Sequence, residues 1–207
     1  MMRRTKEDAE LTKQTILKAA VDVFTERGVA KASLEEIARK ADVTRGAVYW
    51  HFKNKMEIFD ALHENLHTPF IERIMEGLEA EHPNPVGQLQ ELCTNIFLDL
   101  DQDEQLRKTL TLFMLKCDYS GDLKCSQEKH TTAKYDKIQA FSAYYKRAIK
   151  LGQLSADITP EDYTLAMNCF MRGILSEYLE APEAFDITTK APILMKIYFG
   201  GLRTDNV

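Results

Sequence analysis

The 207-residue chain is predicted to fold as an all-α protein with about nine helices. Apolar residues recur at steps of three and four along most of the sequence, which is the spacing of one helix face. Several of these stretches start with residues that cap helix N-termini. No stretch has the alternation expected of a β-strand, and the hydrophobic content of 44% is ample for a buried core.

Three helices are expected in the first third of the chain. The first spans about residues 7–27, and Gly28 with the apolar residue after it is typical of a left-handed helix stop. The second begins after Ser33, because Ser33 and Glu36 have the spacing of a capping box. The third spans about residues 44–51, with a threonine hydroxyl as its cap. Helices of this size and order are typical of a helix-turn-helix module.

The outward face of the third helix is unusual for a surface that meets only water. Arg45 and Tyr49 form one pair four residues apart, Gly46 and Trp50 form another, and neither pair is needed for the core. Two aromatic side chains would be left bare. Tyr and Thr hydroxyls bind phosphate, Arg forks onto guanine, and Gly lets a backbone approach closely. The helix is therefore predicted to bind nucleic acid.

The distribution of charge agrees with a local contact to DNA. The whole chain has a net charge of −5, which argues against general affinity for nucleic acid. Residues 1–55 carry 12 Lys and Arg against 8 Asp and Glu, whereas residues 56–207 carry 15 against 24. A basic start on an acidic remainder is expected where one end contacts phosphates. Charge alone leaves ordinary fluctuation as an alternative.

At these residues the chain resembles the TetR family of bacterial repressors. The segment VTRGAVYWHFKNKMEIF at 43–59 is close to that family's recognition segment, particularly in AcrR-type multidrug regulators. Three further segments are similar to that group: RRTKEDAELTKQTILKAA near the start, LFMLKCDYSGDL at 112–123 and YLEAPEAFD at 178–186. The resemblance implies a repressor that binds palindromic operator DNA as a homodimer. A small hydrophobic or drug-like effector would release it, and the regulated gene would encode an efflux transporter.

With this resemblance, residues 1–53 are expected to form a helix-turn-helix DNA-binding domain, the head. Residues 54–207 are expected to form a ligand-binding and dimerisation domain, the body. Arg45 is expected to read a base, with Gly46 allowing close approach. The expected phosphate contacts are Ser33, Thr44, Tyr49, Trp50, His51, Lys55, Arg3 and Arg4. The resemblance implies most of these contacts, whereas Arg3 and Arg4 are assigned from their charge.

The body is expected to hold six further helices. A stripe of apolar residues after Asn54 predicts a connecting helix that runs to about Leu78, with Pro69 inside it as a kink or a hinge. Later helices are expected over about 86–100, 104–117, 123–151, 160–180 and 193–202. The fourth of these begins with a threonine cap, proline and two acids, a strong helix start.

The helix at 160–180 has more apolar face than one packing partner covers. Together with the last helix it predicts half of a four-helix bundle completed by a second copy of the chain. A central buried helix is the alternative. The candidate interface residues are Met167, Phe170, Ile174, Tyr178, Ile193, Ile197 and Tyr198.

The body is also rich in methionine and aromatic residues, which suit pockets for ligands of varied shape. The resemblance favours a ligand site there, although each residue taken singly is more often plain core. The candidate ligand contacts are His67, Phe70, Ile74, Phe97, Phe113, Met114, Cys117, Phe141, Asn168 and Met171.

Other functions find less support in the sequence. Paired catalytic carboxylates, a Gly-rich phosphate loop, HExxH and a nucleophile motif are all missing, so we do not expect an enzyme. The four cysteines lack metal-site spacing, and we expect no cofactor and no metal. We expect a cytoplasmic protein without a membrane partner, because no signal or spanning segment is seen. A metabolite-sensing regulator of a metabolic operon, repressor or activator, and a protein-binding adaptor remain open alternatives.

Overall fold

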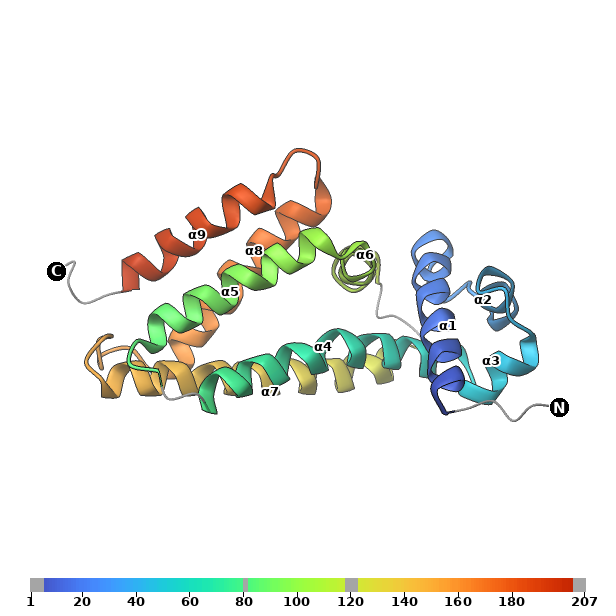
Figure 1. Cartoon of the computed structure of the whole chain (residues 1–207), viewed down its shortest axis with the longest axis horizontal. Coiled ribbons are helices and arrows are strands. Elements are labelled where there is room, and N and C mark those ends of the chain that lie inside the picture. Colours follow the sequence, from blue (N-terminus) through green and yellow to red (C-terminus); the bar gives the residue numbers. More distant parts are fainter. Residues whose placement is uncertain (1–5, 80–81, 118–122, 203–207) are drawn as a thin grey trace. The chain divides into compact units, whose positions relative to one another are not determined.

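Figure 1 shows the computed structural model of the chain, which describes residues 6–79, 82–117 and 123–202. These residues contain helices and no strand, which confirms the all-α class. The helical segments are α1 (Lys6–Arg27), α2 (Leu34–Lys40), α3 (Arg45–His51), α4 (Lys55–Glu79), α5 (Pro85–Gln102), α6 (Glu104–Thr111), η1 (Leu112–Lys116), α7 (Lys124–Lys150), α8 (Pro160–Glu180) and α9 (Ile187–Leu202).

The described ranges thus hold nine α-helices and one π-helical segment, rather than about nine helices in all. The expected helix over 104–117 is divided, because the backbone changes from α-helical to π-helical geometry at Leu112. A π-helical turn accommodates one more residue and rotates the side chains that follow. Leu112, the first residue of this segment, is fully buried, while the expected inward residue Leu110 is only half-buried.

The chain divides into two compact units, and the boundaries between them fall within α4, α6 and α7, although only the first residue of α6, Glu104, lies in the second unit. The first unit consists of Met1–Leu66 and Gln105–His130, and the second of His67–Glu104 and Thr131–Val207. Helix α4 passes from the first unit to the second after Leu66, and α7 does so after His130.

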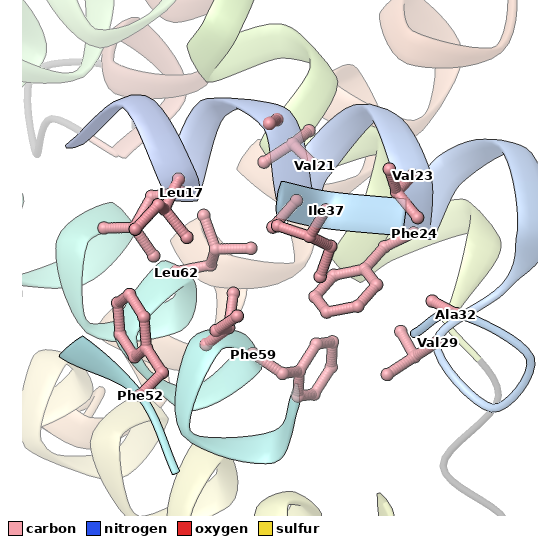
Figure 2. Packing of buried hydrophobic residues seen from close by; sticks show 14 of the residues in the cluster. Leu17, Val21, Val23, Phe24, Val29, Ala32, Ile37, Phe52, Phe59 and Leu62 are labelled. Atoms are coloured by element: carbon pink, nitrogen blue, oxygen red, sulfur yellow. The ribbon is translucent and has the colours of Figure 1, made fainter. Parts of the chain in front are cut away.

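The first unit is built around an apolar core that α1 shares with its neighbours (Figure 2). Phe24 of α1, Ile37 of α2 and Phe59 of α4 are fully buried, and the rings of Phe24 and Phe59 meet edge to face at 6.2 Å. Gly28 ends α1 with a φ of 77°, which confirms the expected left-handed stop. This core holds the short helices α2 and α3 against the long helix α1.

In the second unit, α5 packs along α9. Leu89, Cys93 and Phe97 of α5 are buried, as are Met195 and Phe199 of α9. This packing stabilises the pair by removing two apolar faces from water. The expected cap of α8 is also confirmed, since the Thr159 hydroxyl accepts a hydrogen bond of 3.1 Å from the backbone of Asp162.

Helix α4 is continuous through Pro69, which is exposed. In the second unit the same helix meets α7 closely at Gly77, where a side chain would collide with the hydroxyl of Tyr144. The absence of a side chain lets Tyr144 donate a hydrogen bond of 3.0 Å to the carbonyl oxygen of Ile74. A side chain at this position would displace the Tyr144 hydroxyl and break this hydrogen bond.

Candidate nucleic-acid interface

The start of α2 is fixed by the predicted capping box. The backbone N–H of Glu36 donates to Ser33 Oγ at 3.2 Å, and the backbone N–H of Ser33 donates to the Glu36 carboxylate at 3.0 Å. Hydrogen bonds from the hydroxyl and backbone of Ser33 hold the pKa of Glu36 below its ordinary value. The box confirms the sequence prediction and sets the first residue of the helix.

Four residues turn the chain from α2 into α3. Asp42 has a φ of 52°, a left-handed conformation that aspartate adopts more readily than most side chains. The backbone N–H of Val43 donates to the carbonyl of Ala38 at 3.0 Å. Thr44 then caps α3 by accepting a bond of 3.1 Å from the backbone of Ala47, as predicted. The direction of α3 is therefore set by local hydrogen bonds.

Helix α3 presents a polar and aromatic face to solvent. Val48 is fully buried in the core of the first unit, whereas Trp50 is 71% exposed and Tyr49 is 46% exposed. Arg45 is exposed too, and its Nη2 donates to Tyr49 Oη at 3.4 Å, with the guanidinium 5.3 Å from the Tyr49 ring centroid. The ring of His51 meets that of Trp50 edge to face at 4.4 Å. The outward placement of Arg45, Tyr49 and Trp50 agrees with the sequence prediction, whereas His51, also expected to face outward, is half-buried.

Gly46 lies on the same exposed face, and the fold itself gives no reason for a glycine there. A methyl group added at Gly46 would approach only the Thr44 hydroxyl, at an ordinary 3.9 Å. Alanine would suit a helix better, since glycine costs about 0.5–1 kcal/mol there. A molecule that approaches the backbone of α3 from outside would account for the glycine.

Lys55 has contacts that its sequence position did not reveal. Its Nζ donates to the carbonyl oxygen of Ala32 at 3.2 Å and also to that of Ala30. These bonds tie the first turn of α4 to the segment that precedes α2. Asn54 caps α4 as expected, with its Oδ1 accepting bonds from the backbone of Met56 and Glu57. An ammonium has three N–H donors, so Lys55 retains one beyond the two that are used here.

Four further predicted DNA contacts are either used as helix caps or lie outside the described residues. Ser33 and Thr44 are exposed, although their hydroxyls already serve as helix caps. Arg3 and Arg4 lie outside the described residues.

The candidate ligand contacts fall in both compact units. Phe113, Met114 and Cys117 lie in or next to η1 in the first unit, and all three are half-buried. The second unit holds Ile74, Phe97, Phe141, Asn168 and Met171, of which all but Asn168 are buried. The side chains of His67 and Phe70 lie outside those described. Neither unit brings all of the described candidates together.

A separate pocket in the second unit lies between α5 and α9. Its lining mixes polar and apolar surface and contains none of the ten candidates: it consists of Gly87, Gln90, Glu91, Thr94, Asn95 and Pro192.

The candidate dimer contacts differ in how far their side chains are buried. Met167, Ile174 and Tyr178 are buried within the second unit, so on this structure they contribute to its core and not to an accessible surface. Phe170 and Tyr198 are half-buried, with their rings stacked at 4.9 Å. The candidates Ile193 and Ile197 are exposed, at 49% and 64%, and Leu165, which was not a candidate, is 54% exposed.

Leu165 is the residue that sequence reasoning missed. It lies between Tyr163 and Met167, two members of the buried stripe of α8, and therefore points away from that stripe.

The described residues contain no cluster of three or more His, Cys, Asp or Glu that is arranged to hold a metal ion. Within the same residues, no helix combines the length and the apolar composition needed to cross a bilayer.

Two family models match the chain. That of the bacterial regulatory proteins of the tetR family matches residues 16–62, and that of the C-terminal region of MAATS-type transcriptional repressors matches residues 84–203. The HTH-type transcriptional regulator TtgR of Pseudomonas putida is 32% identical over 187 residues, covering 90% of this chain and 89% of TtgR.

Solved structures give the same result. SmeT in complex with triclosan matches with a TM-score of 0.84 and 32% identity, covering 95% of this chain and 93% of SmeT. SmeT is the repressor of the Stenotrophomonas maltophilia multidrug efflux pump SmeDEF. NalD, the secondary repressor of the MexAB-OprM multidrug efflux pump in Pseudomonas aeruginosa, matches with a TM-score of 0.83 and 34% identity. That match covers 97% of this chain and 100% of NalD.

Proposed function

This chain belongs to the TetR family of bacterial regulatory proteins, and we propose that it is a ligand-responsive repressor of an efflux transporter. In this proposal two copies bind palindromic operator DNA, and a small hydrophobic or drug-like effector releases them. Because bacterial operators lie in the cytoplasm, the proposed function also implies that compartment.

The observation that carries the proposal is the exposed face of α3. Leaving Trp50 and Tyr49 in water forgoes the free energy that burial of an aromatic side chain provides. Duplex DNA offers these residues phosphates, sugars and base edges, and it offers Arg45 a guanine to bind with two hydrogen bonds. The open space at Gly46 allows the backbone of α3 to approach such a surface.

We assign the head to residues 1–53 and the body to residues 54–207. Arg45 reads a base in the major groove, and Gly46 permits the approach. The phosphate contacts are Ser33, Thr44, Tyr49, Trp50, His51, Lys55, Arg3 and Arg4. Lys55 uses its remaining donor for this contact while holding the segment before α2 in place.

A dimer is part of the proposal because one short recognition helix reads few base pairs. Two heads related by a two-fold axis read a near-palindrome in grooves roughly 34–36 Å apart. Leu165, Ile193 and Ile197 provide an exposed aliphatic face on α8 and α9 for the second copy. An interface of this kind is isologous, so the same residues face each other across the axis.

The effector is proposed to act through α4, which continues from the first unit into the second. A ligand that fits only one setting of this helix shifts the pair of heads out of register with successive major grooves. A coupling of about 1–3 kcal/mol would weaken operator binding by roughly 5- to 150-fold. Triclosan is a suitable first probe, because it is bound in the SmeT complex.

The test is a gel shift with the purified full chain and the DNA between its own gene and the neighbouring genes. A salt-sensitive, sequence-selective shift is expected, and an excess of triclosan or another pump substrate should reverse it. A protein that ignores every such promoter at low ionic strength would rule out the proposal. The same behaviour would favour the adaptor alternative.

A further inference from the structure

A carboxylate on α4 contacts three side chains from the start of α7. Asp60 Oδ1 accepts a hydrogen bond of 2.6 Å from Ser126 Oγ, and Asp60 Oδ2 accepts one of 2.7 Å from Lys129 Nζ. His130 Nε2 lies 3.5 Å from Asp60 Oδ1. Burial opposes ionisation of Asp60, but the bonds from Lys129 and Ser126 outweigh it, so its pKa lies below the ordinary value. The charged carboxylate therefore joins the two helices.

One helical turn further along, the same faces bring two histidines together. The rings of His63 on α4 and His130 on α7 are stacked, with their centroids 3.4 Å apart and their planes 1° from parallel. Both side chains are buried, and the rings of Phe59 and Phe113 lie against that of His130. We call the contacts of Asp60, His63, Ser126, Lys129 and His130 the Asp60 junction.

The Asp60 junction lies on α4 and α7, two helices that continue from the first unit into the second. Helix α4 leaves the first unit after Leu66, six residues beyond Asp60, and α7 leaves it after His130. The start of α4 in turn follows α3 by three residues. A movement that travels from the second unit along either helix therefore reaches the Asp60 junction before it reaches α3.

We propose that Asp60 is a positioning residue for operator binding and release, because it fastens α7 to α4 and makes α7 a second carrier of the effector signal. This inference rests on the proposed function. The junction holds the first turns of α4, and with them α3, in the setting that binds DNA. The hydroxyl of Ser126 is buried and has Asp60 as its acceptor. Because a buried hydroxyl that loses its acceptor costs free energy, Ser126 favours the arrangement in which α7 stays bound to Asp60.

The chain offers a matched control at the other end of α7. Glu161 of α8 accepts a hydrogen bond of 3.1 Å from Ser142 Oγ and pairs with Lys146 Nζ at 3.3 Å. It has the same combination of carboxylate, serine and lysine as Asp60, but all three residues belong to the second unit. Glu161→Gln therefore removes a carboxylate that also binds a serine and a lysine of α7, at a more exposed site (52% against 26% for Asp60), without altering the Asp60 junction.

The first experiment measures operator affinity per folded dimer for Asp60→Asn and Glu161→Gln in the full chain. Asp60→Asn should weaken binding by at least about fivefold, the lower end of coupling between sites, whereas Glu161→Gln should match the wild type. Ser126→Ala, a milder change, should weaken binding less and add nothing in the Asp60→Asn background. Wild-type affinity in Asp60→Asn, or an equal loss in Glu161→Gln, overturns the proposal.

The second experiment follows amide hydrogen exchange in the DNA-free proteins. Exchange over Arg45–His51 should be faster in Asp60→Asn than in the wild type and unchanged in Glu161→Gln. Unchanged exchange in Asp60→Asn rejects the positioning role even when no operator is known. Failure of all variants, the wild type included, to bind DNA rejects the proposed function, and the exchange rates over α3 then decide the role of Asp60 by themselves.

Discussion

Two of the regions that expose large apolar side chains differ in their chemistry. On α3 the exposed residues are Tyr49 and Trp50, which carry hydrogen-bond donors and stand beside Arg45. On α8 and α9 they are purely aliphatic, with Ile197 the most exposed. An aromatic face with donors suits a polar, charged partner such as DNA, whereas an aliphatic face suits an apolar partner such as a second copy. Exposure alone does not identify a partner; the polar atoms within the exposed set do.

The largest expected effect comes from placing charge on the aliphatic face. The double change Ile193→Asp and Ile197→Asp should dissociate the dimer, because each isoleucine buried on association contributes roughly 1.5–3 kcal/mol. An unpaired carboxylate at the interface adds a further penalty. Operator affinity should fall by more than about 100-fold, since a loss of about 3 kcal/mol already corresponds to that factor. Sedimentation and gel shifts measure the two effects.

Leu11→Asp is the control for that pair, because Leu11 of α1 is 69% exposed and belongs to neither face. It should leave both the oligomeric state and operator binding intact. A dimer that survives the double change would show that the aliphatic face is not the interface.

The next effect in size concerns base reading on α3. Arg45→Ala should cost about 1–3 kcal/mol of operator binding and relax the preference at one base pair in each half-site. The measurement is affinity over a set of operator variants. Lys55→Ala serves as the comparison: it should weaken all sequences alike and reduce the salt slope by about one unit per half-site. Identical behaviour of the two variants would refute this division of roles.

Gly46→Ala is expected to change folding stability and operator affinity in opposite directions. The free protein has room for the methyl group and should gain up to about 1 kcal/mol of stability, since alanine favours the helix. Operator affinity should fall, because the methyl group occupies the space that DNA approaches. Thermal unfolding and a gel shift on the same sample test this, and a variant that gains stability without losing affinity would contradict it.

The smallest expected effect is a dependence of stability on pH. Burial lowers the pKa of His130 below its ordinary value of 6.5, and nearby Asp60 only partly offsets this. The folded state therefore binds fewer protons than the unfolded state, so this contribution is complete above pH 6.5 and is lost as the pH falls below it. Urea unfolding between about pH 7.5 and 5.5 should show a steeper loss in the wild type than in His130→Gln. Equal slopes would exclude His130 as the source.

Local signals made the starts of α2 and α3 predictable from sequence. The capping hydrogen bonds of these helices join residues only three positions apart, Ser33 with Glu36 and Thr44 with Ala47. Both partners therefore lie within one short stretch of sequence, where the capping pattern can be recognised. Once these caps fix where α2 and α3 begin, the helical period places Val48 inside and Trp50 outside.

The features that escaped prediction depend on residues far apart in the chain. Asp60 and Ser126 are 66 residues apart, and nothing local announces that they bond. On α8 the apolar residues surround much of the helix, so the choice between Met167 inside and Leu165 outside depends on which neighbouring helices cover it. The apolar spacing over 106–117 fits an ordinary α-helix, so the π-helical geometry of Leu112–Lys116 likewise escaped prediction.

The single anchor of α3 has an evolutionary consequence. Val48 is the buried residue of this helix, while Arg45, Gly46, Tyr49 and Trp50 are exposed and the caps at both ends are backbone or hydroxyl contacts. Substitutions at the four exposed positions therefore leave folding nearly untouched. A duplicated gene could acquire a new operator preference in a few mutational steps, and a laboratory library limited to these positions should yield retargeted regulators that still fold.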